Sequence, residues 1–338
     1  MARIVVAGAG ICGMAAGIML ARDGNDVTIV ERDPEPQPTS ADGAWTDWNR
    51  QGVAQFRMGH VLLARGREVL AQHIPDALDE LVALGAVEVP MVPPPTLASW
   101  TPRAGDDRYK MIGARRPVID TAMANIADRT DGLTVRRGVA LTGLLVAADQ
   151  PDGVPHVTGV VTEEGEEIAA DLVVDAMGRR SPMLRWLEAV GAAPAIEESV
   201  DSGFAYYGCY FAARDGKMPT FQAAGLTPFD GYSILVLPGD SGTWFVGVYA
   251  SSNDKDLRVL RDEDTLFRLI ASCPQHAEFL DGEQIGDVIS MVGVTDRDRR
   301  FVVDGAPVVT GMVPIERNAE RATRGWAEVH PEPGNDDR

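Results

Sequence analysis

Short hydrophobic runs alternate with a helical pattern at the start of the chain. Arg3–Ala7 and Val27–Val30 have the length and the continuous apolar character of strands buried on both faces. Between them, the Ala-, Met-, Ile- and Leu-rich segment Met14–Arg22 predicts a helix, and Asp23-Gly24-Asn25 supplies turn residues at its end. One complete β-α-β unit is therefore expected within roughly 30 residues, and such units build parallel sheets.

Predicted helices and strands continue to about residue 174, and from residue 204 strands predominate. Helices are expected over 59–72, 75–84 and 116–128, and strands over 133–137, 140–147, 156–163, 167–169 and 172–174. From residue 204 the pattern becomes rich in strands and aromatic residues, with strands expected over 204–213, 232–237 and 243–250. A helix over 263–271 and a hairpin over 300–310 follow. Strands in series with short turns predict an antiparallel sheet.

These patterns predict an α/β protein in which an antiparallel sheet is inserted into a three-layer, Rossmann-like domain. We expect that domain over residues 1–200 and 285–313, and the inserted sheet over 201–284. Residues 314–338 are polar and contain Pro331, Pro333 and Gly334, so we expect a disordered tail there.

Composition narrows the class of protein. The chain has 338 residues with 45% hydrophobic and 24% charged positions, as in globular proteins of about two domains. Its net charge of −19 argues against general binding of nucleic acid or anionic lipid, which needs a basic surface. No apolar run approaches the ~20 residues of a membrane span. Glycines interrupt the N-terminal apolar stretch, so no signal peptide is predicted.

The potential metal ligands and thiols are scattered. The three cysteines Cys12, Cys209 and Cys273 show neither a disulfide framework nor zinc spacing, so a reducing cytoplasm is expected. The five histidines are not paired at ligand spacing, and we predict no metal site. Cys12 is interpreted as a small residue that fills a tight turn, rather than as a nucleophile.

Gly8, Gly10 and Gly13 form the pattern G-x-G-x-x-G between a predicted strand and a predicted helix. The first glycine permits the tight turn, the second lets the backbone approach a pyrophosphate, and the third lets helix and strand pack closely. The helix N-terminus offers N–H groups and partial positive charge to a phosphate. Glu31 ends the second strand 18 residues after Gly13, where a carboxylate can accept hydrogen bonds from a ribose.

A second candidate segment follows the predicted strand at 172–174. Asp175 and Gly178 lie at the strand end, and Arg179, Arg180 and Ser181 precede a predicted helix. The carboxylate can fix backbone amides or bind a ribose or ribityl hydroxyl, and the arginines can bind phosphate. By itself, this segment is equally compatible with a purely structural turn.

Together, these two motifs resemble those of the FAD-dependent aromatic hydroxylases, the para-hydroxybenzoate hydroxylase-like superfamily. The resemblance covers roughly residues 1–310. It also includes Gln55-Phe56-Arg57 with His60, and Arg115-Arg116-Pro117-Val118-Ile119. It implies that Arg65 approaches the flavin and its pyrophosphate, and that Arg116 lies near the phosphates. The implied cofactor-binding residues are Gly8, Ala9, Gly10, Ile11, Cys12, Gly13, Glu31, Arg32, Arg65, Arg116, Asp175, Gly178 and Arg179.

The same resemblance implies an enzymatic activity. NADPH or NADH would reduce the FAD, oxygen would add to flavin C4a, and the hydroperoxide would hydroxylate or epoxidise a small aromatic or polyketide-like molecule. The flavin carries this chemistry, so no catalytic side chain is predicted. The substrate would lie on the β-rich region, where aromatic side chains can line a pocket or simply pack in the sheet: Tyr206, Tyr207, Tyr210, Phe211, Trp244, Phe245 and Tyr249.

The chain departs from the family after residue 313. The family places Gly-Asp after a strand, followed by a helix that faces the flavin, but here Pro314-Ile315-Glu316-Arg317-Asn318 follows. Asp304-Gly305 and Gly239-Asp240 are poor substitutes, because both lie in predicted turns. We therefore expect an altered or shortened C-terminus and an FAD-binding scaffold with impaired turnover.

Three alternatives remain open. A prenyl-chain reductase of the same fold is compatible with the Asp175–Arg179 segment. The second alternative is a flavin-dependent halogenase of the same fold. Such enzymes carry Trp-x-Trp-x-Ile-Pro, whereas Trp45 and Trp48 are three residues apart and no Ile-Pro follows them, so the sequence gives this alternative no support. The third alternative is a non-catalytic nucleotide-binding protein.

Overall fold

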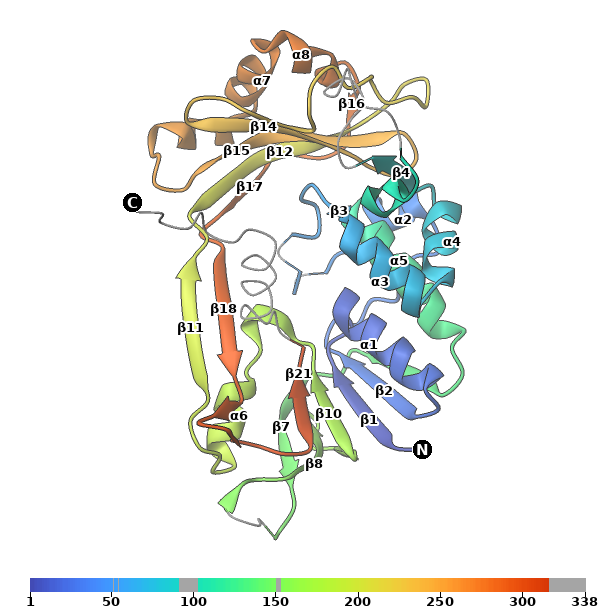
Figure 1. Ribbon diagram of the computed structural model, residues 1–338, viewed down its shortest axis with the longest axis vertical. Helices are drawn as coiled ribbons and strands as arrows, with labels where there is room; N and C mark the ends of the chain where they lie inside the picture. Colours follow the sequence, from blue (N-terminus) through green and yellow to red (C-terminus); the bar gives the residue numbers. More distant parts are fainter. Residues whose placement is uncertain (51, 54, 91–102, 150–152, 316–338) are drawn as a thin grey trace, which may run out of the picture.

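The computed structural model describes residues 1–50, 52–53, 55–90, 103–149 and 153–315. Within these residues, a five-stranded parallel sheet has the strand order β21-β10-β1-β2-β6 (Figure 1). Its strands are β1 (Arg3–Ala7), β2 (Asp26–Glu31), β6 (Leu133–Arg137), β10 (Leu172–Asp175) and β21 (Met312–Pro314). The expected β-α-β unit is present, with α1 (Ile11–Arg22) connecting β1 to β2.

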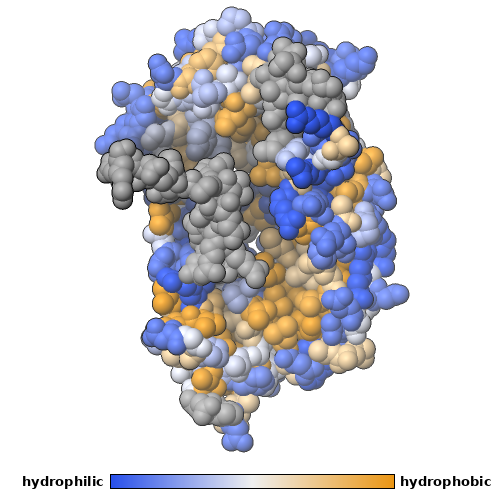
Figure 2. Space-filling model, viewed as in Figure 1, coloured by the Kyte–Doolittle hydropathy of each residue, from blue (hydrophilic) through white to orange (hydrophobic). Residues whose placement is uncertain are grey.

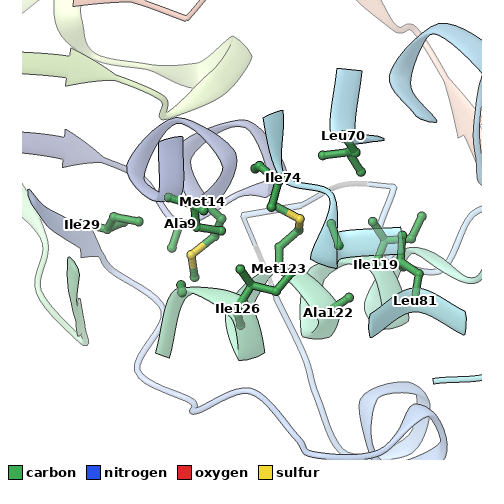
Figure 3. Packing of buried hydrophobic residues seen from close by; sticks show 14 of the residues in the cluster. Ala9, Met14, Ile29, Leu70, Ile74, Leu81, Ile119, Ala122, Met123 and Ile126 are labelled. Atoms are coloured by element: carbon green, nitrogen blue, oxygen red, sulfur yellow. The ribbon is translucent and has the colours of Figure 1, made fainter. Parts of the chain in front are cut away.

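The two faces of this sheet are covered differently. Ile4 and Val6 point to the side of α1, where a core forms with α3 (Ala64–His73), α4 (Asp76–Ala83) and α5 (Arg116–Asp128) (Figure 3). Val5 and Val173 point to the other side, against α6 (Met183–Ala189) and the sheet of β7 (Leu141–Val146), β8 (Val157–Thr162) and β9 (Glu167–Ala169). Because both faces are buried, the central strands β1 and β10 are apolar except at one end, whereas β2 and β6 also contain polar residues such as Thr28 and Thr134. The predicted three-layer α/β fold is confirmed.

A second, antiparallel sheet stands at the other end of the molecule (Figure 1). Its order is β13-β14-β15-β12-β16, and β17 also pairs with β12. The helices α7 (Glu263–Ala271) and α8 (Pro274–Ala277) cover its outer face. The strands are β12 (Phe204–Ala212), β13 (Leu226–Pro228), β14 (Tyr232–Pro238), β15 (Thr243–Ser251), β16 (Glu283–Gln284) and β17 (Ile289–Val292).

A two-stranded ribbon runs between the two sheets along one side of the molecule (Figure 1). β11 (Ile196–Asp201) pairs antiparallel with β18 (Thr295–Arg300), and the chain enters and leaves the antiparallel sheet through them. β17 lies beyond residue 284, where we expect the inserted sheet to end. The division of the chain at residues 200 and 284 stays a prediction.

Several local elements differ from expectation. The helix expected over 59–72 begins only at Ala64, because β3 (Val61–Leu62) pairs with β5 (Lys110–Gly113), which also pairs with β4 (Val87–Pro90). The helix α1 begins at Ile11 instead of Met14, so its N-terminus lies within the glycine turn. The helix α2 (Ala41–Thr46) has no counterpart in the prediction, and its Ser40 side chain caps it by accepting from Gly43 N.

The expected hairpin at 300–310 is reduced to β19 (Val302–Val303) paired with β20 (Ala306–Pro307). Most of the expected polar tail, residues 316–338, lies outside the described residues. In the described part of the chain, no helix combines the length and the apolar character that crossing a membrane requires.

Candidate functional site

The glycine turn has the geometry that its sequence predicts. Gly8 has a φ of +104°, and a Cβ atom there would lie 2.7 Å from the Ala176 carbonyl oxygen. At Gly13 a Cβ would lie 1.9 Å from the Gly8 carbonyl oxygen, so only glycine fits between α1 and the turn. At Gly10, by contrast, nothing lies within 4 Å of an added Cβ. Packing therefore requires glycine at positions 8 and 13, whereas Gly10 faces open space that a ligand can enter.

Gly10 is also the N-cap of α1, and no side chain caps the helix there. The N–H groups of the first helical turn therefore have no partner inside the helix. Together with the helix dipole, they form a site suited to a phosphate group. Cys12 is exposed, which corrects the expectation that its side chain fills the turn.

Glu31 fixes this turn from the end of β2. Its Oε2 accepts a hydrogen bond from Ala9 N at 2.8 Å, and its Oε1 accepts one from Asp33 N at 3.1 Å. Oε2 is also 2.6 Å from Nη2 of Arg50, and the carboxylate is only 8% exposed. The side chain points toward the turn, as predicted, and it retains acceptor capacity on Oε1 for one hydroxyl group.

Arg50 is the centre of a buried network that the sequence does not reveal. Its Nη1 donates to the Ala9 carbonyl at 2.9 Å and to Asp120 at 3.3 Å, and its Nε donates to Asp33 at 3.4 Å. Asp120 in turn accepts from Nε of Arg116 at 2.9 Å. Arg50 therefore joins the glycine turn, the end of β2 and helix α5, and the network includes the predicted Arg116.

Asp175 lies beside the turn because Ala7 on β1 is its register partner. Its Oδ1 accepts from Met177 N at 3.0 Å and its Oδ2 accepts from the Ser181 hydroxyl at 2.6 Å. Burial raises the pKa of this carboxyl group. The carboxylate thus holds its own loop, which is the structural role considered for it from the sequence.

The predicted cofactor-binding residues Arg32, Arg65, Gly178 and Arg179 lie at the surface. Arg32 is exposed and its guanidinium lies over Gly52. Arg65 is 76% exposed and pairs at 2.6 Å with Glu68, one helical turn along α3. Gly178 and Arg179 are exposed in the loop after β10. The structure therefore brings together the glycine turn, Glu31, Arg116 and Asp175, but not Arg32, Arg65 or Arg179.

A second buried ion pair joins the two sheets. Arg115, the N-cap of α5, donates from its backbone N at 2.8 Å and from Nη2 at 2.6 Å to Asp240, in the turn between β14 and β15. Both side chains are almost fully buried, at 2% and 0% exposed. The Arg115 guanidinium also lies 5.1 Å from the Trp45 ring centroid. Sequence analysis assigned neither Arg115 nor Asp240 to this contact.

Alternation along the strands separates the predicted pocket aromatics into two groups. Tyr207, Phe211 and Trp244 point toward α7 and α8 and belong to the core there, so they are packing residues. Tyr206, Tyr210 and Phe245 point to the opposite face, and Tyr206 contacts Tyr249 at 4.9 Å between ring centroids. Tyr206 and Tyr249 are half-buried. Tyr210 and Phe245 are almost fully buried, so Tyr206 and Tyr249 are the members of this set that can contact a molecule between the sheets.

The space-filling view, drawn from the same direction as Figure 1, shows hydrophobic residues on the face of the molecule that is turned to the viewer. They gather over β1, β10 and α1 in the lower half of Figure 2, whereas α3 and α4 present hydrophilic residues. The glycine turn therefore borders an apolar surface. An apolar surface next to polar contacts is typical of a small-molecule site.

His60 connects the two halves of the site. Its backbone N donates to the Tyr210 hydroxyl at 3.2 Å. Burial, together with the charge of Arg116, lowers the pKa of His60 from 6.5 to about 4. The imidazole is therefore neutral in the folded protein at pH 7.

This pKa shift predicts an acid-sensitive stability. Between pH 6.5 and 4 the unfolded chain takes up a proton at His60 that the folded protein does not bind. The free energy of unfolding should therefore fall as the pH falls through this window, by about 2–3 kcal/mol from this residue. Urea unfolding at pH 7 and pH 4.5 should show a smaller loss for His60→Gln than for the unmodified protein. Equal losses in the two proteins would contradict the assignment.

Comparisons with known proteins identify the fold of the chain and one distant relative in sequence. No family model matches the chain. Over 298 residues it is 29% identical to Protein Rv3254 of Mycobacterium tuberculosis, covering 80% of this chain and 59% of that protein. The chain thus spans 59% of the length of this curated relative.

Solved structures are similar in fold at low sequence identity. PqsL, a probable FAD-dependent monooxygenase from Pseudomonas aeruginosa, aligns with a TM-score of 0.64 and 15% identity over 92% of this chain and 78% of its own. The myxobacterial halogenase CndH aligns with a TM-score of 0.61 and 18% identity over 93% of this chain and 67% of its own. The chain has the fold of the FAD-dependent monooxygenases and halogenases, which confirms the predicted resemblance at the level of fold.

The Diels-Alderase PyrE3 aligns with a TM-score of 0.56 and 18% identity over 92% of this chain and 58% of its own. The reactions named for these three structures differ, so the shared fold does not choose among them.

Proposed function

We propose that this protein is an FAD-dependent oxidoreductase. The observation that carries the proposal is the open space over Gly10 at the uncapped N-terminus of α1, with Glu31 pointing at the same turn. A pyrophosphate needs close approach to backbone N–H groups, and a ribose needs a nearby carboxylate. The similarity in fold to FAD-dependent monooxygenases and halogenases supports FAD as the nucleotide.

In this proposal each part of the site has one task. The first turn of α1 binds the pyrophosphate, and Oε1 of Glu31 accepts a ribose hydroxyl. Arg50 and Arg116 hold Glu31 and the turn in place through Asp120. The bound flavin supplies the redox chemistry.

The proposed reaction is an NADPH- or NADH-dependent hydroxylation or epoxidation of a small aromatic or polyketide-like molecule. The half-buried Tyr206 and Tyr249 lie on the sheet face that does not pack against α7 and α8. Their rings can contact an aromatic substrate and exclude water from it. This part of the proposal would fit the expectation that the β-rich region holds the substrate.

An absorbance spectrum after reconstitution with FAD, followed by oxygen uptake with NADPH or NADH, tests the proposed function. We expect one bound FAD per chain and oxygen uptake that a suitable aromatic compound increases. A folded protein that binds no FAD would contradict the proposal. A protein that binds FAD without oxidising either nicotinamide cofactor would favour the impaired scaffold, for which the missing Gly-Asp after residue 313 is the supporting observation.

A further inference from the structure

The segment from Met58 to His60 is fixed against the inner face of the antiparallel sheet, the face that does not pack against α7 and α8. Met58 is buried and packs with Tyr210 and Phe245. A Cβ atom at Gly59 would lie 2.5 Å from the Phe245 ring, so the backbone lies directly on that ring. The backbone N of His60 donates to the Tyr210 hydroxyl at 3.2 Å. These contacts give the backbone of His60 one defined position.

The chain continues from His60 into the other half of the molecule. β3 follows directly and pairs with β5, and Ile112 of β5 belongs to the core on the α1 side of the parallel sheet. Figure 1 shows β3 below the antiparallel sheet in that view, beside α3. The charge of Arg116, at the start of α5, also acts on the His60 imidazole. His60 therefore lies where the two halves of the molecule meet.

The imidazole of His60 is partly buried, yet a bound molecule can reach it. Its hydrogen bond to Tyr210 uses the backbone N, and in the described part of the chain the ring nitrogens have no hydrogen-bond partner. Neither ring nitrogen is among the buried polar atoms that lack a partner, so both reach the molecular surface. The ring thus offers free hydrogen-bonding capacity beside the inner face of the antiparallel sheet.

This capacity includes an acceptor. Burial, together with the charge of Arg116, lowers the pKa of His60 to about 4. The neutral ring donates from one nitrogen and accepts on the other, whereas the neighbouring Arg116 can only donate. A hydroxyl group of a bound molecule can therefore donate to His60 but not to Arg116.

We propose that His60 is a specificity-determining residue, which accepts a hydrogen bond from a hydroxyl group on the aromatic substrate. This inference rests on the proposed function, because it assumes that the substrate lies on the inner face of the antiparallel sheet with Tyr206 and Tyr249. The tyrosine rings contact the apolar part of the substrate, and one polar contact from His60 fixes its orientation. A substrate analogue without the hydroxyl proton leaves the accepting nitrogen unpaired and binds more weakly.

Binding of phenols and of their methyl ethers to the FAD-reconstituted protein tests this inference. The probes are a naphthol and a hydroxyanthraquinone, each compared with its methyl ether, which lacks the O–H donor. We expect the unmodified protein to bind at least one phenol about threefold to tenfold more tightly than its ether, as one hydrogen bond contributes. His60→Leu should abolish this preference, and His60→Gln, whose amide oxygen can accept, should retain most of it. His73→Leu is the matched control, because His73 is exposed at the end of α3.

The ethers separate hydrogen bonding from packing. If His60→Leu weakened the binding of a phenol and of its ether equally, His60 would only pack against the substrate, and the inference would be overturned. An unmodified protein that binds FAD but prefers neither phenol over its ether would also overturn it. Both results leave the proposed function intact. A folded protein that binds no FAD would overturn the proposed function and this inference with it.

Discussion

Replacing Arg50 with methionine should lower the free energy of unfolding by about 3–5 kcal/mol, because removing one member of a buried charge cluster leaves its partners uncompensated. The Arg50 side chain is 2% exposed, and it lies within ion-pair distance of Glu31, Asp33 and Asp120. Methionine retains much of the volume but none of the donors. Urea unfolding monitored by circular dichroism measures the loss.

The control is Arg22→Met on the surface of α1. Arg22 pairs with Asp76 at 2.8 Å, but both side chains are more than a third exposed. Solvent screens such pairs, so the variant should lose at most about 1 kcal/mol. If Arg50→Met were no more destabilising than Arg22→Met, Arg50 would not organise the glycine turn.

Replacing Asp240 with alanine should have an effect of similar size, about 3–5 kcal/mol, because the buried Arg115 guanidinium would keep only the exposed carboxylate of Asp42, 3.8 Å away. The pair is formed by residues 125 positions apart and connects α5 to the turn between β14 and β15. The variant should also weaken the contact between the two sheets. Urea unfolding gives the free energy, and limited proteolysis reports earlier release of the antiparallel sheet.

The double variant Arg115→Met with Asp240→Leu distinguishes the loss of the ion pair from the loss of side-chain packing. Replacement of both charges by apolar side chains of similar size removes the unpaired charge, so the double variant should be more stable than Asp240→Ala. Two independent, additive losses would show that the ion pair does not couple the sheets.

The parallel half of the fold could be predicted because its signals are local. The buried strands have continuous apolar runs, and the G-x-G-x-x-G spacing of Gly8, Gly10 and Gly13 stands between a predicted strand and a predicted helix, which is the context that makes this pattern informative. Glu31 could be placed because it ends a strand that this unit defines. The segment 59–63 could not, since Val61 and Leu62 are strand residues only through pairing with β5, whose sequence lies 50 residues away.

The residues that sequence reasoning missed are single charged or aromatic side chains in loops or at element ends. Arg50 carries no spacing signal, and its partners Glu31, Asp33 and Asp120 come from several parts of the chain. Gly239-Asp240 was interpreted as a turn, which is correct, but its role depends on Arg115 approaching it from another layer. Such contacts depend on the tertiary arrangement of the elements. The periodicity of apolar positions along the chain does not predict that arrangement.

The most direct test of the central claim is the dissociation constant of FAD for the unmodified protein and for Gly10→Ala, measured by calorimetric titration. An alanine methyl group at position 10 enters the open space where nothing lies within 4 Å, so the fold should remain intact. If this turn holds the pyrophosphate, the unmodified protein binds one FAD per chain and the variant binds it at least about tenfold more weakly, as expected when close backbone approach is blocked. Equal affinity of the two proteins for FAD would contradict the account.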